Sequence, residues 1–291
     1  MPEPIRYIER TRAWYAALGF ETPYAWADNR DTPPPFCLLA KPLSESRIAI
    51  ITTAAPFDPE KGDQRPGALY NGSAKFFTSY RGDARRADTR ISHIAYDREH
   101  TTAQDQQSWL PIDALENAQI AGSIGTANEF FYGAPTNRSQ RTTREVDAPA
   151  LLAMLREDKV DAAVLVPNCP VCHQTVTLVA RHLEANRIPT VILGCARDIV
   201  EQASAPRFVF SDFPLGNGAG KPNDPLSQAS TLSLALGVLA NAVEPATVVN
   251  PLVWNDDHGW KDDYSNPEKL NAEELALRRA AFDQQKAAAK S

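Results

Sequence analysis

The sequence predicts an α/β protein with a doubly wound, mostly parallel sheet, helices on both faces, a long N-terminal arm and a C-terminal helical tail. Short apolar segments rich in β-branched residues alternate with amphipathic helical segments, which is the pattern of a buried parallel sheet. Several apolar segments end in polar or small residues, as strands do where open α/β folds bind ligands. We expect one α/β domain over residues 1–291, with a core at 46–222 between an N-terminal helix and arm at 1–45 and C-terminal helices at 223–291.

The N-terminal part is expected to contain a helix, an arm, a strand and a long loop. Pro4–Leu18 is rich in aromatic residues and arginine and predicts a helix, which the irregular Pro23–Pro35 follows as an arm. Arg47–Thr53 is apolar throughout its centre and predicts the first core strand. Pro56–Arg90 is rich in glycine, proline and charged residues and lacks sustained periodicity, which indicates a long loop. A strand is expected after it, near His93.

The centre of the chain carries the alternation on which the fold class depends. The run Val160–Val166 is short, apolar and β-branched, which suits a buried parallel strand. After it, Cys172–Asn186 places its apolar side chains on one helical face. The other expected elements are, in order, a helix over Ile112–Gln119, a strand around Ser123–Tyr132, a helix over Ala148–Glu157, and strands over Pro189–Leu193 and Arg207–Phe210.

The last part of the chain is expected to be mainly helical. Pro225–Ala242 is rich in leucine and alanine, Thr247–Trp254 adds a strand or an extended wrap, and the charged Pro267–Lys290 forms a peripheral helix. Between them, Asn255–Tyr264 carries four aspartates and one histidine. Its spacing matches no calcium-binding loop, so a solvated acidic turn is expected there rather than a cation site.

Composition excludes several classes of function. The chain of 291 residues has a formal net charge of −6, whereas nucleic-acid binding depends on a basic surface. It contains no apolar stretch of about 18 residues and no charged-then-apolar leader, so neither a membrane span nor a secretory signal is expected. Its four cysteines are unevenly spaced and do not form a disulfide framework. We therefore expect a cytoplasmic protein that binds neither nucleic acid nor a membrane.

The pair Cys169 and Cys172 lies where the Val160–Val166 run gives way to a helix. Asn168 is expected to cap that helix. Cysteines at a helix N-terminus meet unpaired backbone N–H groups and the positive end of the helix dipole, and both favour the thiolate over the thiol. The position of the pair therefore predicts a nucleophile that is available near neutral pH.

Two other interpretations of this pair stay open. A Cys-x-x-Cys pair is also half of a structural zinc site, but such a site needs four ligands, usually from two such pairs. The remaining cysteines, Cys37 and Cys195, are isolated in the sequence. Inert packing is the third interpretation. We favour the reactive dithiol and assign no metal ligands.

Polar residues are expected to gather at the carboxyl edge of the sheet. Parallel strands point the same way, and ligands of open α/β folds bind at that edge. This convergence predicts a substrate site independently of the cysteine argument. The residues that end the expected strands are Thr52, Thr53, Asn168, Cys169, Cys195, Ser211 and Asp212.

Two histidines and a glycine-rich segment are further candidates. His173 lies one helical turn beyond Cys169, so its imidazole is a candidate to stabilise a thiolate or relay a proton, although a histidine without such a role is nearly as common. His93 precedes Asp97 near an expected strand end. The segment Gly216–Lys221, which contains Asn217, lacks the spacing of a phosphate-binding loop.

Several separated motifs resemble the selenoprotein B family of glycine, sarcosine, betaine and D-proline reductases. The likeness spans roughly residues 45–220 and keeps the family's order. Cys169 stands where the family's selenium members carry selenocysteine, Cys172 stands at the first following cysteine, and Thr175 replaces the second, so the chain resembles a selenium-free branch. The motifs are VPNCPVCHQT, Ile188–Val191, Phe213–Asn217, Arg47–Ala54 with Pro56–Asp58, Ile91–His93 through Tyr96–Asp97, Leu110–Asp113 and Gly122–Gly125.

This resemblance implies a thiol-dependent reductase that cleaves an activated carbon–heteroatom bond of a small molecule. Cys169 would be the nucleophile, Cys172 the resolving thiol, and His173 their catalytic neighbour. No bound cofactor is expected, and an external dithiol or a thioredoxin-type protein would supply the electrons. Because cysteine is a poorer nucleophile and leaving group than selenocysteine, the substrate is expected to be more activated than a bare amine. The substrate-binding residues would be Thr52, Thr53, His93, Asn168, Cys195, Asp212 and Asn217.

Two alternative functions and one possible interface remain from the sequence. A cofactor-independent isomerase or racemase would need Cys195 or Cys37 to face Cys169 and would consume no reductant. A dithiol redox sensor would toggle without turnover. A homo-oligomer is possible, because the aromatic side chains of Trp14, Tyr15, Tyr24 and Trp26 are candidates to cover a neighbouring subunit, although packing within their own chain is the commoner case.

Overall fold

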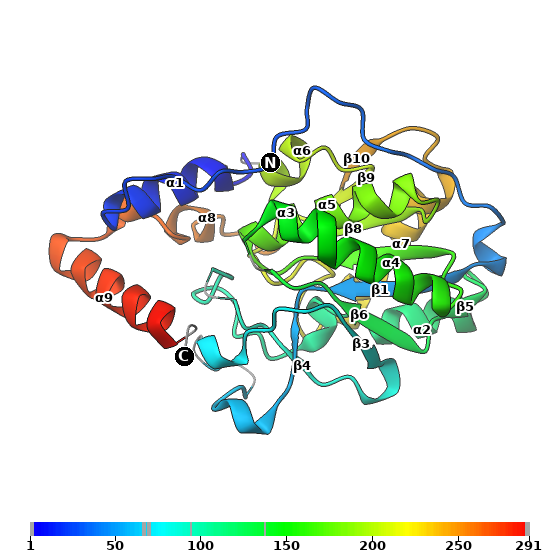
Figure 1. Ribbon diagram of the computed structural model, residues 1–291, viewed down its shortest axis with the longest axis horizontal. Helices are drawn as coiled ribbons and strands as arrows, with labels where there is room; N and C mark the ends of the chain where they lie inside the picture. Colours follow the sequence, from blue (N-terminus) through cyan, green and yellow to red (C-terminus); the bar gives the residue numbers. More distant parts are fainter. Residues whose placement is uncertain (1–2, 66–67, 69–70, 94, 137, 289–291) are drawn as a thin grey trace.

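The computed structural model describes residues 3–65, 68, 71–93, 95–136 and 138–288. Within them, an eight-stranded sheet forms the centre of the molecule (Figure 1). All of its neighbouring strands run parallel except β3, which is antiparallel to β6. In spatial order the strands are β10 (Ala246–Val249), β9 (Arg207–Phe210), β8 (Thr190–Gly194), β7 (Ala162–Val166), β1 (Arg47–Thr52), β6 (Phe130–Gly133) and β3 (Tyr80–Asp83), and β5 (Thr126–Ala127) also pairs with β1.

Helices cover both faces of this sheet because alternate residues of each buried strand point to opposite sides. In β1, Ile48 and Ile50 belong to the core that includes α2 (Ile112–Ile120) and α7 (Pro225–Asn241). Ala49 and Ile51 belong to the core that includes α4 (Ala148–Glu157) and α5 (Pro170–Ala185). The predicted α/β class, mostly parallel sheet and two-sided helix cover are confirmed.

Most predicted elements lie where the sequence placed them. The strand β9 and the helix α4 have the predicted bounds, and α2 begins at the predicted residue. The short helix α6 (Arg197–Gln202) connects β8 to β9. The predicted strand around Ser123–Tyr132 is divided into β5 and β6, since Asn128 turns its side chain back to the Phe130 carbonyl between them.

Two predictions in the segment before α2 were wrong. The expected strand near His93 is absent from the described residues there: the two-residue β4 (Thr89–Arg90) pairs with β2 (Ala55–Pro56), and the chain is irregular from Ile91. The buried Ile91 and Tyr96 side chains pack this segment into the core that includes α2 and α7 instead of adding it to the sheet. The predicted Pro56–Arg90 loop itself supplies β3, and the ring of Tyr80 lies against Gly133, where any side chain would collide with it.

The predicted C-terminal helix begins later than expected. Pro267–Lys269 forms a separate 3-10 turn, and α9 spans Ala272–Ala288. Asn271 and Glu274 explain this start, because each side chain accepts a hydrogen bond from the other's backbone N–H, as in a capping box. The predicted end of the helix at Lys290 lies outside the described residues. No helix in the described ranges is long and apolar enough to cross a membrane.

The N-terminal arm is fastened to the amino edge of the sheet by a buried ion pair. Arg207 of β9 and Glu184 of α5 meet at 2.7 Å with both side chains inaccessible to solvent. Arg207 also donates to the Cys37 carbonyl at 2.7 Å, and the Cys37 N–H donates to Glu184 at 2.7 Å. The guanidinium lies over the Phe36 ring. One pair of charges therefore joins the arm, α5 and β9.

The two ends of the chain pack together over the carboxyl ends of β8 and β9. The first helix, α1 (Tyr7–Ala17), and the short α8 (Trp260–Asp263) share an apolar cluster with Phe213 and Cys195. Lys261 forms an ion pair with Asp212. The predicted acidic turn is solvated at Asn255–Asp257 and at Asp262, whereas Trp260 and Tyr264 are buried in that cluster and anchor its second half.

We expect the Glu184→Ala substitution to lower the free energy of unfolding by about 3–5 kcal/mol, because it leaves the Arg207 guanidinium buried without its partner charge. Equilibrium urea unfolding provides the measurement. The matched control is Glu201→Ala, which removes the half-exposed partner of Arg197 and should cost less than about 1 kcal/mol. Equal losses in the two variants would contradict the role of the buried pair.

Candidate active site

The Cys-x-x-Cys pair lies at the junction of β7 and α5, as the sequence predicted. Cys169, not Asn168, is the N-cap residue: its sulfur accepts a hydrogen bond from the Cys172 N–H at 3.2 Å. Pro170 explains the difference, since a proline at the first helical position holds the preceding residue in the extended conformation that an N-cap needs. The cap thus places a sulfur atom directly on the N-terminus of the helix.

Residues from two other segments complete the surroundings of the dithiol. His93, Cys169 and Cys172 are all buried, and their potential ligand atoms lie within 4.8 Å of one another. The Thr136 hydroxyl donates to the Cys172 sulfur at 3.4 Å. Thr136 was not predicted, although it follows β6 at the same carboxyl edge and the strand-end rule would have included it.

The two sulfurs differ in their affinity for a proton. Burial raises the pKa of the Cys169 thiol well above its usual value, and the neighbouring Cys172 sulfur adds to the increase. Burial also opposes ionisation of Cys172, but hydrogen bonding from Cys169, the charge of His93 and the Thr136 hydroxyl outweigh it and hold the pKa of Cys172 well below its usual value. The pair therefore favours a state with one thiolate, stabilised at Cys172.

His173 connects the dithiol to the neighbouring strand. One ring nitrogen, Nδ1, lies 2.8 Å from the Cys169 carbonyl oxygen, and the other, Nε2, accepts the Cys195 N–H at 2.9 Å. Burial lowers the pKa of His173 to about 4, so the ring is neutral and Nδ1 carries the donated proton. Gly194 leaves room for the ring, because a Cβ there would stand 2.8 Å from two of its atoms. Both nitrogens are thus engaged by backbone groups.

A set of buried polar atoms near the dithiol has no hydrogen-bond partner among the described residues. They are both amide atoms of Asn168 and Nδ1 of His93, and the hydroxyl of Ser92, which precedes His93 in the sequence, is also unpartnered. Asn168 is held in place through its backbone N–H, which donates to the Thr53 hydroxyl at 3.1 Å. Buried polar groups are normally satisfied, so unpartnered ones beside a reactive pair indicate groups that a ligand or water completes.

The remaining predicted site residues lie apart from the sulfurs. Thr52 donates to the Trp109 carbonyl, on the opposite face from Thr53. The Cys195 sulfur points to the Pro214 carbonyl. Asp212 is paired with Lys261. Asn217 closes its own loop through the Pro214 carbonyl. The structure thus brings only Thr53, His93, Asn168 and His173 next to the Cys-x-x-Cys pair.

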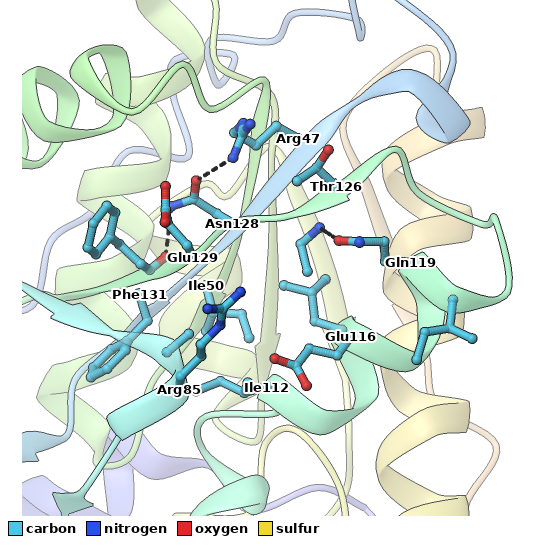
Figure 2. Close-up of a pocket in the computed structure, with 15 residues that line it drawn as sticks. Arg47, Ile50, Arg85, Ile112, Glu116, Gln119, Thr126, Asn128, Glu129 and Phe131 are labelled. Atoms are coloured by element: carbon cyan, nitrogen blue, oxygen red, sulfur yellow. Dashed lines mark hydrogen bonds between the residues drawn. The ribbon is translucent and has the colours of Figure 1, made fainter.

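A separate open cavity of about 420 Å³ lies at the other end of β1 (Figure 2). Its lining includes Arg47, Glu116 and Glu129, with α2 along one side. The cavity follows the first part of β1 from Arg47 to Ile50, and roughly 10 Å of strand separates Ile50 from Thr53 beside the dithiol. It contains neither cysteine nor histidine and does not belong to the candidate site.

Fold and site together define an open α/β protein with a buried Cys-x-x-Cys pair at the carboxyl edge of its sheet. The chain is 29% identical over 223 residues to D-proline reductase subunit gamma of Acetoanaerobium sticklandii, covering 75% of this chain and 88% of that protein. It is 24% identical over 212 residues to glycine reductase complex component B subunit gamma of Symbiobacterium thermophilum and 26% identical over 216 residues to that of Carboxydothermus hydrogenoformans. Those two matches cover 72% of this chain but only about half of each relative (49% and 48%).

The chain is thus similar to the gamma subunits of D-proline reductase and of glycine reductase component B, which agrees with the resemblance that the sequence motifs predicted. These relatives are subunits of reductases, which supports the oxidoreductase class expected from the sequence. No family model and no solved structure matches it.

We expect Gly194→Ala to destabilise the protein by about 1–3 kcal/mol, because the added methyl group displaces the His173 ring from the Cys195 N–H. The matched control is Gly237→Ala in α7, where a Cβ meets no atom within 4 Å. That substitution should stabilise the protein by about 0.5–1 kcal/mol, since alanine favours a helix over glycine. Urea unfolding measures both, and a neutral Gly194→Ala would contradict the close fit of the ring.

Proposed function

We propose that the protein is a thiol-dependent reductase that cleaves an activated carbon–heteroatom bond of a small molecule. The observation that carries the proposal is the sulfur of Cys169 on the N-terminus of α5 with the sulfur of Cys172 beside it. Cys169 is the nucleophile because it retains slight exposure, whereas Cys172 is fully buried beneath it. Cys172 serves first as the base and then as the resolving thiol.

The first half-reaction forms a carbon–sulfur bond. The Cys169 thiol gives its proton to the Cys172 thiolate, and the Cys169 thiolate attacks the substrate carbon. The carbon–heteroatom bond breaks, and the leaving group takes its electron pair and the proton now on Cys172. The products are a thioether on Cys169, the protonated leaving group and a regenerated Cys172 thiolate.

The second half-reaction reduces the substrate fragment. The Cys172 thiolate attacks the Cys169 sulfur, a disulfide forms, and the carbon fragment leaves with the electron pair and takes a proton from water. Because this fragment departs as a carbanion, its carbon must be adjacent to a carbonyl or carboxyl group. An external dithiol or a thioredoxin-type protein, acting in a reducing cytoplasm, then reduces the disulfide and restores the enzyme.

In this mechanism His173 is a positioning residue. One ring nitrogen is hydrogen-bonded to the Cys169 carbonyl and the other to the Cys195 N–H, so neither nitrogen is free to relay a proton. The unpartnered amide of Asn168 and the Ser92 hydroxyl are the groups that we assign to substrate binding. Lys75 is a further candidate, because burial lowers its pKa while the charges of both site cysteines act to raise it.

The relatives support a reductase with protein partners, since those named above are subunits of reductases. We do not carry D-proline or glycine over as the substrate, because a cysteine stands at the selenocysteine position. The mechanism itself requires one partner, a reductant that delivers electrons to the Cys169–Cys172 disulfide.

The geometry favours the reductase over the isomerase alternative. An isomerase needs a second cysteine on the wall facing Cys169, but Cys195 points into the apolar cluster of α1 and α8, and Cys37 lies beside Glu184 at the amino edge of the sheet. A redox sensor shares the dithiol with the proposed reductase and differs from it only in lacking turnover.

The reactivity of the thiols is the first test. Burial, followed by the neighbouring Glu184 charge, raises the pKa of Cys37 to about 12, so little thiolate is present there at pH 8. We expect limiting iodoacetamide at pH 8 to label the Cys169 and Cys172 pair ahead of Cys37 and Cys195, as read by peptide mass spectrometry. Mild oxidation should join Cys169 to Cys172. Faster labelling of Cys37 would count against the site.

A resolving-thiol variant separates the reductase from the sensor and the isomerase. Cys172→Ser removes both the base and the attacking thiol, so reaction with substrate at raised pH should stop after one event and leave a covalent adduct on Cys169. Intact-protein mass spectrometry of the variant after incubation with a metabolite extract detects the adduct. Cys195→Ser is the control and should form no lasting adduct. Multiple turnover by Cys172→Ser without a thiol donor would rule out the mechanism.

A further inference from the structure

The dithiol has a third potential ligand that its proposed chemistry does not use. His93 comes from the irregular segment after β4, far from α5 in the sequence, yet its imidazole meets both sulfurs. One ligand atom from each of His93, Cys169 and Cys172 lies within 4.8 Å of the others, and all three side chains are buried. The fold therefore assembles two sulfurs and one imidazole around a single point.

This donor set suits a thiophilic divalent cation. Zinc is bound tetrahedrally by cysteine sulfur at about 2.3 Å and histidine nitrogen at about 2.0–2.1 Å, and sites with three protein ligands keep a fourth position open. The two negative thiolates balance the double positive charge of the cation, and the imidazole is uncharged. The bound site is therefore neutral overall. Charge neutrality matters here because an uncompensated charge is costly to bury.

The unpartnered polar atoms supply an independent indication of a ligand. Nδ1 of His93 is buried and accepts or donates no hydrogen bond within the described ranges. The Asn168 side chain is fully buried, and neither its oxygen nor its nitrogen has a partner there. Asn168 adjoins Cys169 and is fixed through Thr53. An amide in this position can hold a water or small anion that fills the open position of a metal ion.

We propose that the reduced site binds one divalent cation of the zinc class through His93, Cys169 and Cys172, with the fourth position open. Because both sulfurs are ligands, metal binding and disulfide formation exclude one another. The cation thus holds the dithiol reduced and out of reaction until it is removed. The proposal does not depend on the reductase reaction, since it uses only the arrangement of the three side chains.

Cobalt(II) provides the test, because its thiolate complexes absorb light and zinc displaces it. Reduced, metal-free protein is titrated with Co²⁺ without oxygen. We expect sulfur-to-cobalt charge transfer and tetrahedral ligand-field bands that saturate at one cobalt per chain and disappear when Zn²⁺ is added. His93→Ala should weaken cobalt binding by at least about tenfold, since loss of an outer-shell partner alone costs that much. His258→Ala, in the C-terminal tail, should bind as the wild type does.

A second variant protects the test against a failure to fold. His93→Cys replaces the imidazole by a third sulfur and should retain stoichiometric binding with stronger charge transfer. Absence of charge transfer in the reduced wild-type protein, or equal affinity in wild type and folded His93→Ala, would overturn the proposal. Each of these outcomes leaves the Cys169–Cys172 disulfide unaffected, so failure of the metal site is distinguishable from failure of the reductase mechanism.

Discussion

The site depends on the neutral imidazole of His173, which holds two strand ends together. Its ring donates a hydrogen bond to the Cys169 carbonyl at the start of α5 and accepts one from the Cys195 N–H at the end of β8. The ring occupies the space that Gly194 leaves open. Together with the bond from the Asn168 N–H to the Thr53 hydroxyl, this bridge sets the rotation of the first turn of α5 against the sheet. That rotation decides where both sulfurs point, and hence whether Thr136 and His93 can reach them.

Sequence patterns predicted the location of the site well and its composition only in part. The strand-end rule correctly placed Asn168, Cys169 and Thr53 together, because parallel strands share one edge. It also included Thr52 and Cys195, whose side chains turn to other faces. Adjacent residues of a strand alternate between faces, so Thr52 and Thr53 could not both have served. His93 lies in an irregular segment, and the periodicity of apolar residues in a sequence does not predict where such a segment lies.

The two ends of α5 are fixed by different kinds of contact, and only the contacts at its N-terminus are local in the sequence. At the N-terminus, Pro170 and the capping sulfur of Cys169 are local features of the sequence. Towards the C-terminus, Glu184 is held by Arg207 and by the arm at Cys37, which are distant in the sequence. Contacts between remote charges leave no pattern in the intervening residues. Both ends of the helix that carries the dithiol are therefore tied to other parts of the fold.

The cluster of α1 and α8 over β8 and β9 has a consequence for the order in which the protein matures. Lys261, which pairs with Asp212, and Trp260, which covers the same edge, follow every strand of the sheet in the chain. A ribosome therefore exposes all of the strands and both site cysteines before it supplies the segment that shields this edge. The edge formed by β8 and β9 therefore stays partly uncovered during synthesis until Trp260 and Lys261 have left the ribosome and packed against it.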